Sequence, residues 1–171
     1  MVRARPVRDG MFLNRIIILA NTYTQLHIQF VFAVQNRISL IQTSWEEELF
    51  KYTTGIVKNH KHKMIAINGM PDHLHLFVGL HPTQSISSLM QIVKGESSEW
   101  INKKEFVKGK FQWQEGYGAF SYGHSQVNQV YSYVMNQKEH HNKRSFLEEY
   151  TELLQKFDVP FDPKYIFQPI D

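Results

Sequence analysis

Two histidines separated by a single leucine are the residues whose spacing most directly suggests chemistry. They lie in the segment Asp72-His73-Leu74-His75-Leu76, in which polar and apolar residues alternate. Because side chains alternate between the two faces of a strand, His73 and His75 are expected to point the same way, with Cα atoms about 7 Å apart. Two imidazoles so placed can share one metal ion and leave coordination positions for substrate oxygens. The spacing fits equally well two exposed histidines on the polar face of an amphipathic strand.

A tyrosine is the second candidate for chemistry, because the 171-residue sequence contains no cysteine. A phenol can act as a covalent nucleophile. We expect a helix to begin near Ser125, and its apolar stripe predicts that Tyr131 lies in the core, with Val127, Val130 and Val134. Tyr133 falls on a flanking polar stripe, where Gln137 is its i, i+4 neighbour, so phenol and amide can project together. A half-buried tyrosine with no catalytic role is the alternative interpretation.

Two further histidine pairs favour other roles. His60 and His62 lie at a predicted turn among lysines and have no apolar residue between them, which indicates a solvated basic loop. His140 and His141 are adjacent, so their side chains diverge on a helix and do not predict a metal pair.

The composition is that of one globular domain with a mild positive charge. The chain is 42% hydrophobic, and 19 Lys and Arg against 16 Asp and Glu give a formal net charge of +3. This balance permits a polyanionic partner without requiring one. The absence of cysteine excludes a disulfide scaffold and thiolate zinc sites. The N-terminal apolar run 16–20 is too short for a membrane span, so we expect a cytoplasmic protein.

The elements that must position these residues follow from hydrophobic periodicity and capping signals. Strands are predicted over 26–34, 64–67, 73–80 and about 119–122, with the second and third forming a hairpin. Helices are predicted to begin at Ser44, Ser85, Ser125 and Ser145. This order predicts an α+β protein with a ferredoxin-like split βαβ antiparallel sheet and additional C-terminal helices. We expect a basic, loosely held extension over 1–20, one domain over 21–163 and an extended tail over 164–171.

His73-Leu74-His75 followed by Tyr133 to Gln137 resembles the small single-tyrosine HUH transposases of the insertion-sequence-two-hundred type, including their REP-associated relatives. The resemblance runs from about residue 21 to 163. Other segments that carry it are Tyr23 to His27, Gly69 to Asp72, Lys94-Gly95, Trp113-Gln114 and His140-His141. Gln29 and Gln35 depart from it, because relatives often carry His and Lys there.

The resemblance implies a metal-dependent enzyme that cuts and rejoins single-stranded DNA at insertion-sequence ends. His73, His75 and Gln137 would bind Mg²⁺ or Mn²⁺, and Tyr133 would form a 5′-phosphotyrosine. Family members are dimers in which the tyrosine helix can complete the partner's histidine pair. The resemblance therefore implies a homodimer, and if its active sites are shared, Tyr133 need not lie near His73 of its own chain.

Hairpin DNA is the partner that the resemblance implies, and basic side chains are candidates for holding its phosphates. The candidates are Lys58, Lys61, Lys63, Lys94, Lys103 and Lys104, with Tyr117 or Trp113 stacking on a base. Solvated lysines and core aromatics are the alternative for each.

Two other functions compete with a transposase. A domesticated or non-catalytic hairpin DNA or RNA binding protein would keep the same fold. An iron-dependent oxygenase would use the histidine pair, but its barrel needs more strands than this chain provides.

Overall fold

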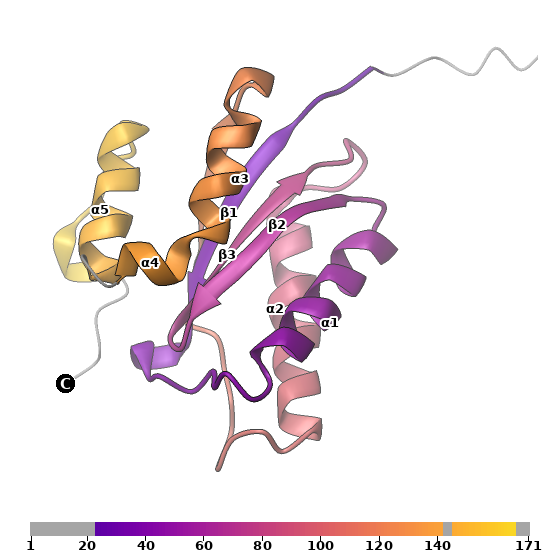
Figure 1. Cartoon of the computed structure of the whole chain (residues 1–171), viewed down its shortest axis with the longest axis vertical. Helices are drawn as coiled ribbons and strands as arrows, with labels where there is room; N and C mark the ends of the chain where they lie inside the picture. Colours follow the sequence, from indigo (N-terminus) through magenta and orange to yellow (C-terminus); the bar gives the residue numbers. More distant parts are fainter. Residues whose placement is uncertain (1–22, 142–144, 167–171) are drawn as a thin grey trace, which may run out of the picture.

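The computed structural model describes residues 23–141 and 145–166 of the chain (Figure 1). The predicted extension over 1–20 lies outside the described residues, as does most of the predicted tail. Four strands form one sheet in the order β2-β3-β1-β4, and every neighbouring pair is antiparallel. The strands are β1 (His27–Ala33), β2 (Lys63–Met70), β3 (His73–Gly79) and β4 (Gly118–Tyr122). This arrangement confirms the predicted α+β, ferredoxin-like sheet and the β2–β3 hairpin.

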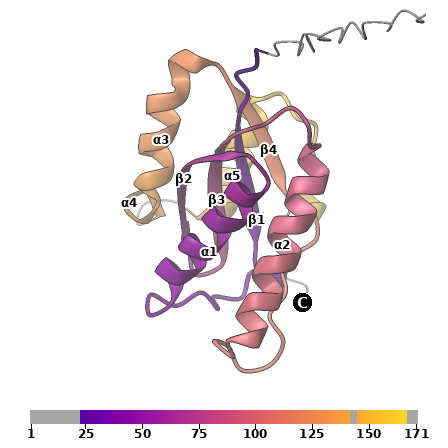
Figure 2. The ribbon, with the colours of Figure 1, turned by 90° about the vertical axis from the view of Figure 1, so that its right-hand side faces the viewer.

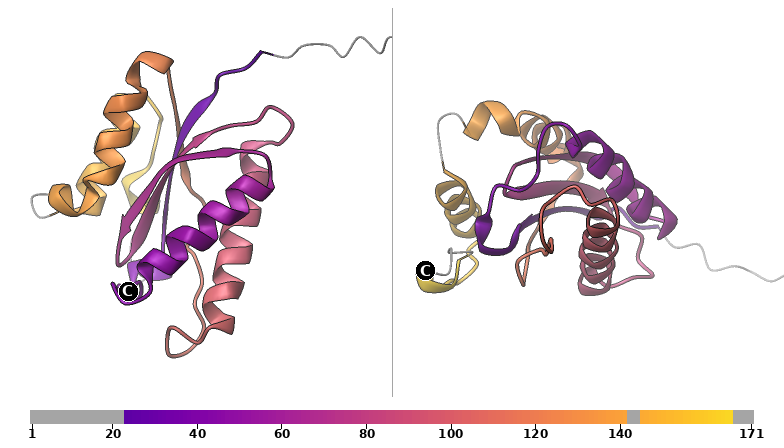
Figure 3. Two further views of the ribbon diagram at one scale, coloured as in Figure 1. Left: turned by 45° about the vertical axis from the view of Figure 1, so that its right-hand side comes forward. Right: turned by 90° about the horizontal axis from the view of Figure 1, so that it is seen from below.

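Two helices cover one face of the sheet. They are α1 (Glu46–Asn59) and α2 (Ile86–Lys103), which lie side by side in the left view of Figure 3 and in front of the sheet in Figure 2. Alternating residues of β1 and β3 point into this layer, as their period predicts. The core there includes Ile28, Phe30, Phe32, Val34, Leu74, Leu76 and Val78.

The two helices begin in different ways. The side chain of Ser85 accepts a hydrogen bond from the Ser88 backbone N–H, so the predicted cap of α2 is confirmed. The predicted Ser44 cap of α1 is wrong, because Trp45 holds that position without a side-chain capping bond. Trp45 is buried and its ring stacks on Phe106 at 4.9 Å. Burial of the indole therefore fixes the start of α1.

A second helical layer covers the opposite face, where Figure 1 shows α3, α4 and α5 together. These helices are α3 (Val127–Met135), α4 (Gln137–His141) and α5 (Phe146–Lys156). Apolar side chains of α3 and α5 pack on Val31, Phe77 and Phe120 of the sheet. Both faces of β3 are therefore buried. Within the described residues, no helix is long and apolar enough to cross a membrane.

The helix that carries the candidate tyrosine is shorter and differently oriented than predicted. It stops at Met135, and Asn136 interrupts it with φ −96° and ψ 20° before α4 begins. Tyr131 is 44% exposed, so its predicted core position is wrong. The stripe that faces the sheet consists of Val130, Tyr133, Val134 and Gln137. It has the same i, i+3, i+4, i+7 spacing as the predicted stripe but begins three residues later.

Candidate active site

The histidine pair lies in the interior of the protein, between β3 and the second helical layer. His73 and His75 are both 0% exposed, and the Phe146 ring of α5 lies 4.2 Å from the His73 ring. The interpretation of two exposed histidines is therefore wrong. One nitrogen of each ring and one oxygen of Glu149 lie within 4.8 Å of one another. This cluster has the donors and the spacing for one metal ion.

His73 is oriented by a carboxylate in the β2–β3 turn. Its Nδ1 lies 2.7 Å from Asp72 Oδ1, and the other carboxylate oxygen of Asp72 accepts a hydrogen bond from Arg37 at 3.1 Å. Burial acts to raise the pKa of Asp72, but His73 and Arg37 outweigh it and hold that pKa below its ordinary value. The ionised carboxylate directs the His73 Nδ1–H, which leaves Nε2 as the ligand atom.

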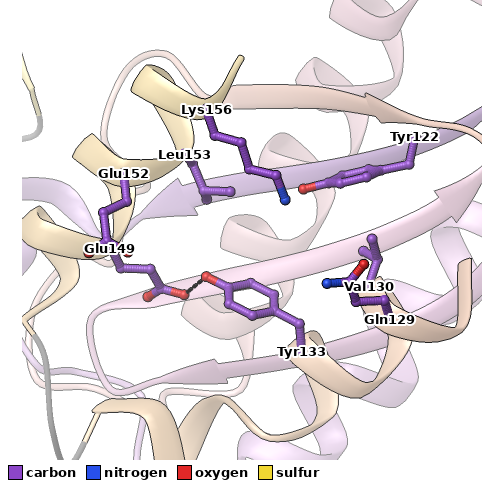
Figure 4. Close-up of a pocket in the computed structure, with 8 residues that line it drawn as sticks. All are labelled: Tyr122, Gln129, Val130, Tyr133, Glu149, Glu152, Leu153 and Lys156. Atoms are coloured by element: carbon purple, nitrogen blue, oxygen red, sulfur yellow. Dashed lines mark hydrogen bonds between the residues drawn. The ribbon is translucent and has the colours of Figure 1, made fainter. Parts of the chain in front are cut away.

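Tyr133 lies beside the histidines of its own chain. Its ring centroid is 6.2 Å from that of His75, and its hydroxyl donates a hydrogen bond to Glu149 Oε1 (Figure 4). Burial and the negative charge of Glu149 raise the pKa of the Tyr133 phenol far above its ordinary value. The phenol therefore stays protonated at neutral pH while Glu149 is its neighbour.

Gln137 completes the group from the first residue of α4. It is fully buried, and its Nε2 donates to Glu149 Oε1 at 2.9 Å. Its Oε1 has no hydrogen-bond partner among the described residues. A buried amide oxygen without a partner is costly unless another group satisfies it. The predicted set of His73, His75, Gln137 and Tyr133 is thus brought together in one chain.

Glu149 is the site residue that the sequence prediction missed. It lies on the buried face of α5, among Phe146, Tyr150, Leu153 and Leu154. A charged residue is rarely buried unless it is paired. The signal in the sequence is a glutamate at a position of the apolar stripe of this helix. Such a glutamate indicates that a polar group lies opposite it in the fold.

A cavity of about 180 Å³ is lined by residues of β4, α3 and α5, and Tyr133 is one of them. In Figure 4, Glu149 lies beside the Tyr133 phenol, and Lys156 and Tyr122 lie above it in the view. The remaining lining residues are Gln129, Val130, Glu152 and Leu153.

The predicted DNA-contacting lysines do not gather at this site. Lys63 pairs with Gly79 at the far end of β3, six residues and about 20 Å from His73, and Lys58 and Lys61 precede it in the chain. Lys103 and Lys104 lie at the end of α2, on the opposite face of the sheet. All five of these lysines are exposed.

Lys94 and Tyr117 have structural partners. The Lys94 ammonium donates to the carbonyl oxygens of Gln114 and Gly116, each at 2.7 Å, and burial lowers its pKa. The half-buried ring of Tyr117 meets Phe30 edge-on at 6.3 Å between centroids. Lys94 thereby anchors the loop that carries Tyr117.

The second histidine pair differs from its prediction. His62 is buried, its Nδ1 accepts from the His81 backbone N–H at 2.9 Å, and its Nε2 lies 2.7 Å from Gln84 Oε1. The interpretation as a fully solvated loop is wrong for His62, because these partners hold it in the fold. The side chains of His140 and His141 lie outside the described part of the structure.

The break between α3 and α4 is fixed from the sheet by Asn68. Its Nδ2 donates to the Met135 carbonyl at 2.7 Å, and its Oδ1 accepts from the Gly69 N–H at 2.9 Å. We expect Asn68→Ala to destabilise the protein by about 1–3 kcal/mol, because the buried partners lose their hydrogen bonds. Urea unfolding measures this loss. Asn128→Ala, at an exposed position of α3, is the control, and equal stability of the two variants would contradict the prediction.

Comparison with known proteins assigns the family. The sequence pattern of the IS200-like transposases matches residues 22–137, more than half of the chain. The chain belongs to the IS200-like transposase family. No curated protein matches the sequence of this IS200-like transposase.

Solved structures share the fold of this IS200-like transposase. A protein of Deinococcus radiodurans R1 described as a transposase has a TM-score of 0.55 at 21% identity, over 70% of this chain and 95% of that one. A REP-associated tyrosine transposase bound to a REP hairpin has a TM-score of 0.55 at 12% identity, over 90% of this chain and 93% of that one. At these identities the likeness concerns the fold.

Proposed function

We propose that this IS200-like transposase cuts and rejoins single-stranded DNA through a 5′-phosphotyrosine on Tyr133. The observation that carries the proposal is the position of the Tyr133 phenol, beside a buried histidine pair and in the lining of a cavity. The phenol oxygen would attack the scissile phosphorus, and the P–O3′ bond would break to leave a free 3′-hydroxyl. Attack on the phosphotyrosine by that 3′-hydroxyl, or by the 3′-hydroxyl of another strand, would reverse the step and release Tyr133. No nucleotide cofactor is therefore needed.

The donor set of the site supports a divalent cation, Mg²⁺ or Mn²⁺. His73 and His75 would hold it through Nε2. Gln137 Oε1, which has no hydrogen-bond partner in the part of the chain that the structure describes, would be the third ligand. When bound, such a cation neutralises and orients the phosphate oxygens. Glu149 would either add a carboxylate ligand or take the phenol proton as the bond to phosphorus forms, since its oxygen already holds the Tyr133 hydroxyl.

Hairpin DNA is the proposed substrate. The REP-associated transposase of similar fold was solved with a REP hairpin, and the exposed lysines at the ends of α1 and α2 offer positive charge away from the site. The scissile strand would approach Tyr133 through the cavity, where Lys156 supplies a cation near the phenol. We place the catalytic domain at residues 21–163.

The direct test uses a single-stranded hairpin oligonucleotide labelled at either end, with Mn²⁺. A 5′-phosphotyrosine keeps the 3′-labelled fragment on the protein in a denaturing gel and releases the 5′-labelled fragment. The opposite labelling pattern would refute the proposed polarity. Tight hairpin binding that persists in EDTA, with no cleavage in Mn²⁺ or Mg²⁺, would favour the non-catalytic hairpin-binding alternative.

The proximity of Tyr133 to His75 in one chain predicts an active site that each subunit completes alone. A mixture of Tyr133→Phe and His73→Ala proteins is then expected to form no adduct, because neither chain holds both groups. Recovery of about a quarter or more of the wild-type adduct would instead indicate sites shared between subunits, an arrangement that the family resemblance leaves open. Mixtures of each variant with wild-type protein control for inhibition.

A further inference from the structure

A buried hydrogen-bond chain reaches His75 from the side opposite to Glu149. The Tyr122 hydroxyl donates to Gln29 Oε1 at 2.8 Å, and Gln29 Nε2 lies 3.2 Å from His75 Nδ1. All three residues are buried, and Gln29 and His75 are 0% exposed. Nothing in the proposed cleavage chemistry uses Gln29 or Tyr122.

The register of the sheet places these three side chains in reach of one another. Gln29 is opposite Phe77 on β3 and opposite Phe120 on β4. His75 on β3 and Tyr122 on β4 are therefore the diagonal neighbours of Gln29. All three side chains lie on the face of the sheet that α3 and α5 cover. Diagonal neighbours lie about 7–8 Å apart at their backbones, which long side chains can span. The chain of hydrogen bonds thus crosses three strands.

The present direction of these bonds fixes the tautomer of His75. An amide N–H donated to Nδ1 requires a lone pair there, so the ring proton lies on Nε2. That nitrogen faces Glu149 Oε1 at 3.8 Å. A cation bound at Nε2 needs a lone pair on Nε2, so the proton must then lie on Nδ1 and must find an acceptor.

Gln29 can supply that acceptor by turning its amide through 180°. Oε1 would then accept the Nδ1–H of His75, and Nε2 would donate to the Tyr122 oxygen. A hydroxyl both donates and accepts, so Tyr122 satisfies either orientation. Burial raises the pKa of Tyr122 to about 12, so it keeps its proton at neutral pH. Tyr122 also lines the cavity, so its O–H can turn away from Gln29 toward that space.

We propose that Gln29 and Tyr122 are positioning residues that let His75 exchange ring tautomers, with Nε2–H facing Glu149 when the site is empty and a bare Nε2 when a cation binds. The proposal rests on the metal site of the proposed function. His73 differs, because the Asp72 carboxylate can only accept and holds its proton on Nδ1 in both states.

Imidazole ¹⁵N NMR of the full chain tests this proposal, with Zn²⁺ as a diamagnetic probe that binds imidazole. The wild-type His75 signals are expected to report Nε2–H without Zn²⁺ and Nδ1–H with it, whereas His73 reports Nδ1–H throughout. The His75→Ala variant assigns the signals. A His75 tautomer that does not change on Zn²⁺ binding would overturn the proposal, as would a failure of Zn²⁺ to bind.

Three substitutions give a second, independent readout in Mn²⁺ affinity. Gln29→Met removes the acceptor at nearly constant volume and is expected to weaken Mn²⁺ binding about 10–100-fold. Tyr122→Phe should weaken Mn²⁺ binding less than Gln29→Met does, because the Gln29 amide still forms its hydrogen bond with His75. Gln29→Glu can only accept, so it should hold Nδ1–H in both states and bind Mn²⁺ at least as tightly as wild type.

The controls separate this proposal from folding and from the cleavage chemistry. Gln112→Met, at an exposed position, should leave Mn²⁺ affinity unchanged. If Gln29→Met does not fold, the tautomer of His75 in metal-free Gln29→Glu remains a test. We expect Nδ1–H there, and Nε2–H would overturn the proposal. Adduct formation by wild type together with unchanged Mn²⁺ affinity in Gln29→Met would reject the positioning role alone. A tautomer exchange without any adduct would reject the proposed function alone.

Discussion

Tyr133→Phe is expected to abolish the covalent DNA adduct, with a loss of at least about a thousandfold. The substitution removes one oxygen atom and leaves the ring, which packs beside His75 in the second core. The lost oxygen is the one that donates to Glu149 Oε1. Hairpin binding and Mn²⁺ affinity should remain within a few-fold of wild type, because both depend on other residues. Denaturing gels with 3′-labelled DNA measure the adduct.

Tyr131 provides a matched control for this experiment. It lies two residues earlier on the same helix and is 44% exposed, so Tyr131→Phe changes the same atom without reaching the site. It should form adduct at the wild-type level. Adduct that persists in Tyr133→Phe, or that disappears in Tyr131→Phe, would reject Tyr133 as the nucleophile.

His73→Ala is expected to remove the stabilisation of the fold by Mn²⁺. A ligand that binds only the native state stabilises it by about 2.7 kcal/mol at 100 times its Kd, which corresponds to about 5–10 °C in Tm for a chain of this size. The wild-type Tm should rise by this amount with Mn²⁺ and return on addition of EDTA. His73→Ala should show no rise. An equal rise in both proteins would place the metal elsewhere.

The same measurement distinguishes the two candidates for the third ligand. Gln137→Ala and Glu149→Ala each remove one donor from the cluster, and both donors are buried. The variant that loses more of the Mn²⁺-dependent rise identifies the stronger ligand. If Glu149 serves only to accept the phenol proton, Glu149→Ala should keep the rise and lose the adduct.

The sequence was sufficient to predict the sheet and the histidine-bearing strand. The alternation of His73, Leu74, His75 and Leu76 gave both the strand and the shared face of the histidines, because a period of two depends on local geometry. Their burial was not predictable in this way. It depends on α3 and α5, which pack on that face through residues distant in the chain.

The tyrosine helix illustrates the same limit. Two stripes with identical i, i+3, i+4, i+7 spacing exist on it, one through Tyr131 and one through Tyr133 and Gln137. Hydrophobicity favoured the first, but the second is the one that faces the sheet. Asn68 ends α3 by binding the Met135 carbonyl from a neighbouring strand, and such a long-range contact has no local signal. The resemblance to a family pointed to Tyr133 and Gln137 by residue type alone, whichever stripe faces the sheet.

The cover over His73 has a kinetic consequence. The Phe146 ring lies 4.2 Å from the His73 ring, and Phe146 is the first residue of α5, itself a buried part of the core. A cation beneath this helix can leave only when α5 moves away or the cavity beside Tyr133 widens. Under the proposed function, loading and release of the metal would require movement of α5 or of the cavity wall that it forms, so the exchange rate of the ion and the amide hydrogen exchange of α5 should change together.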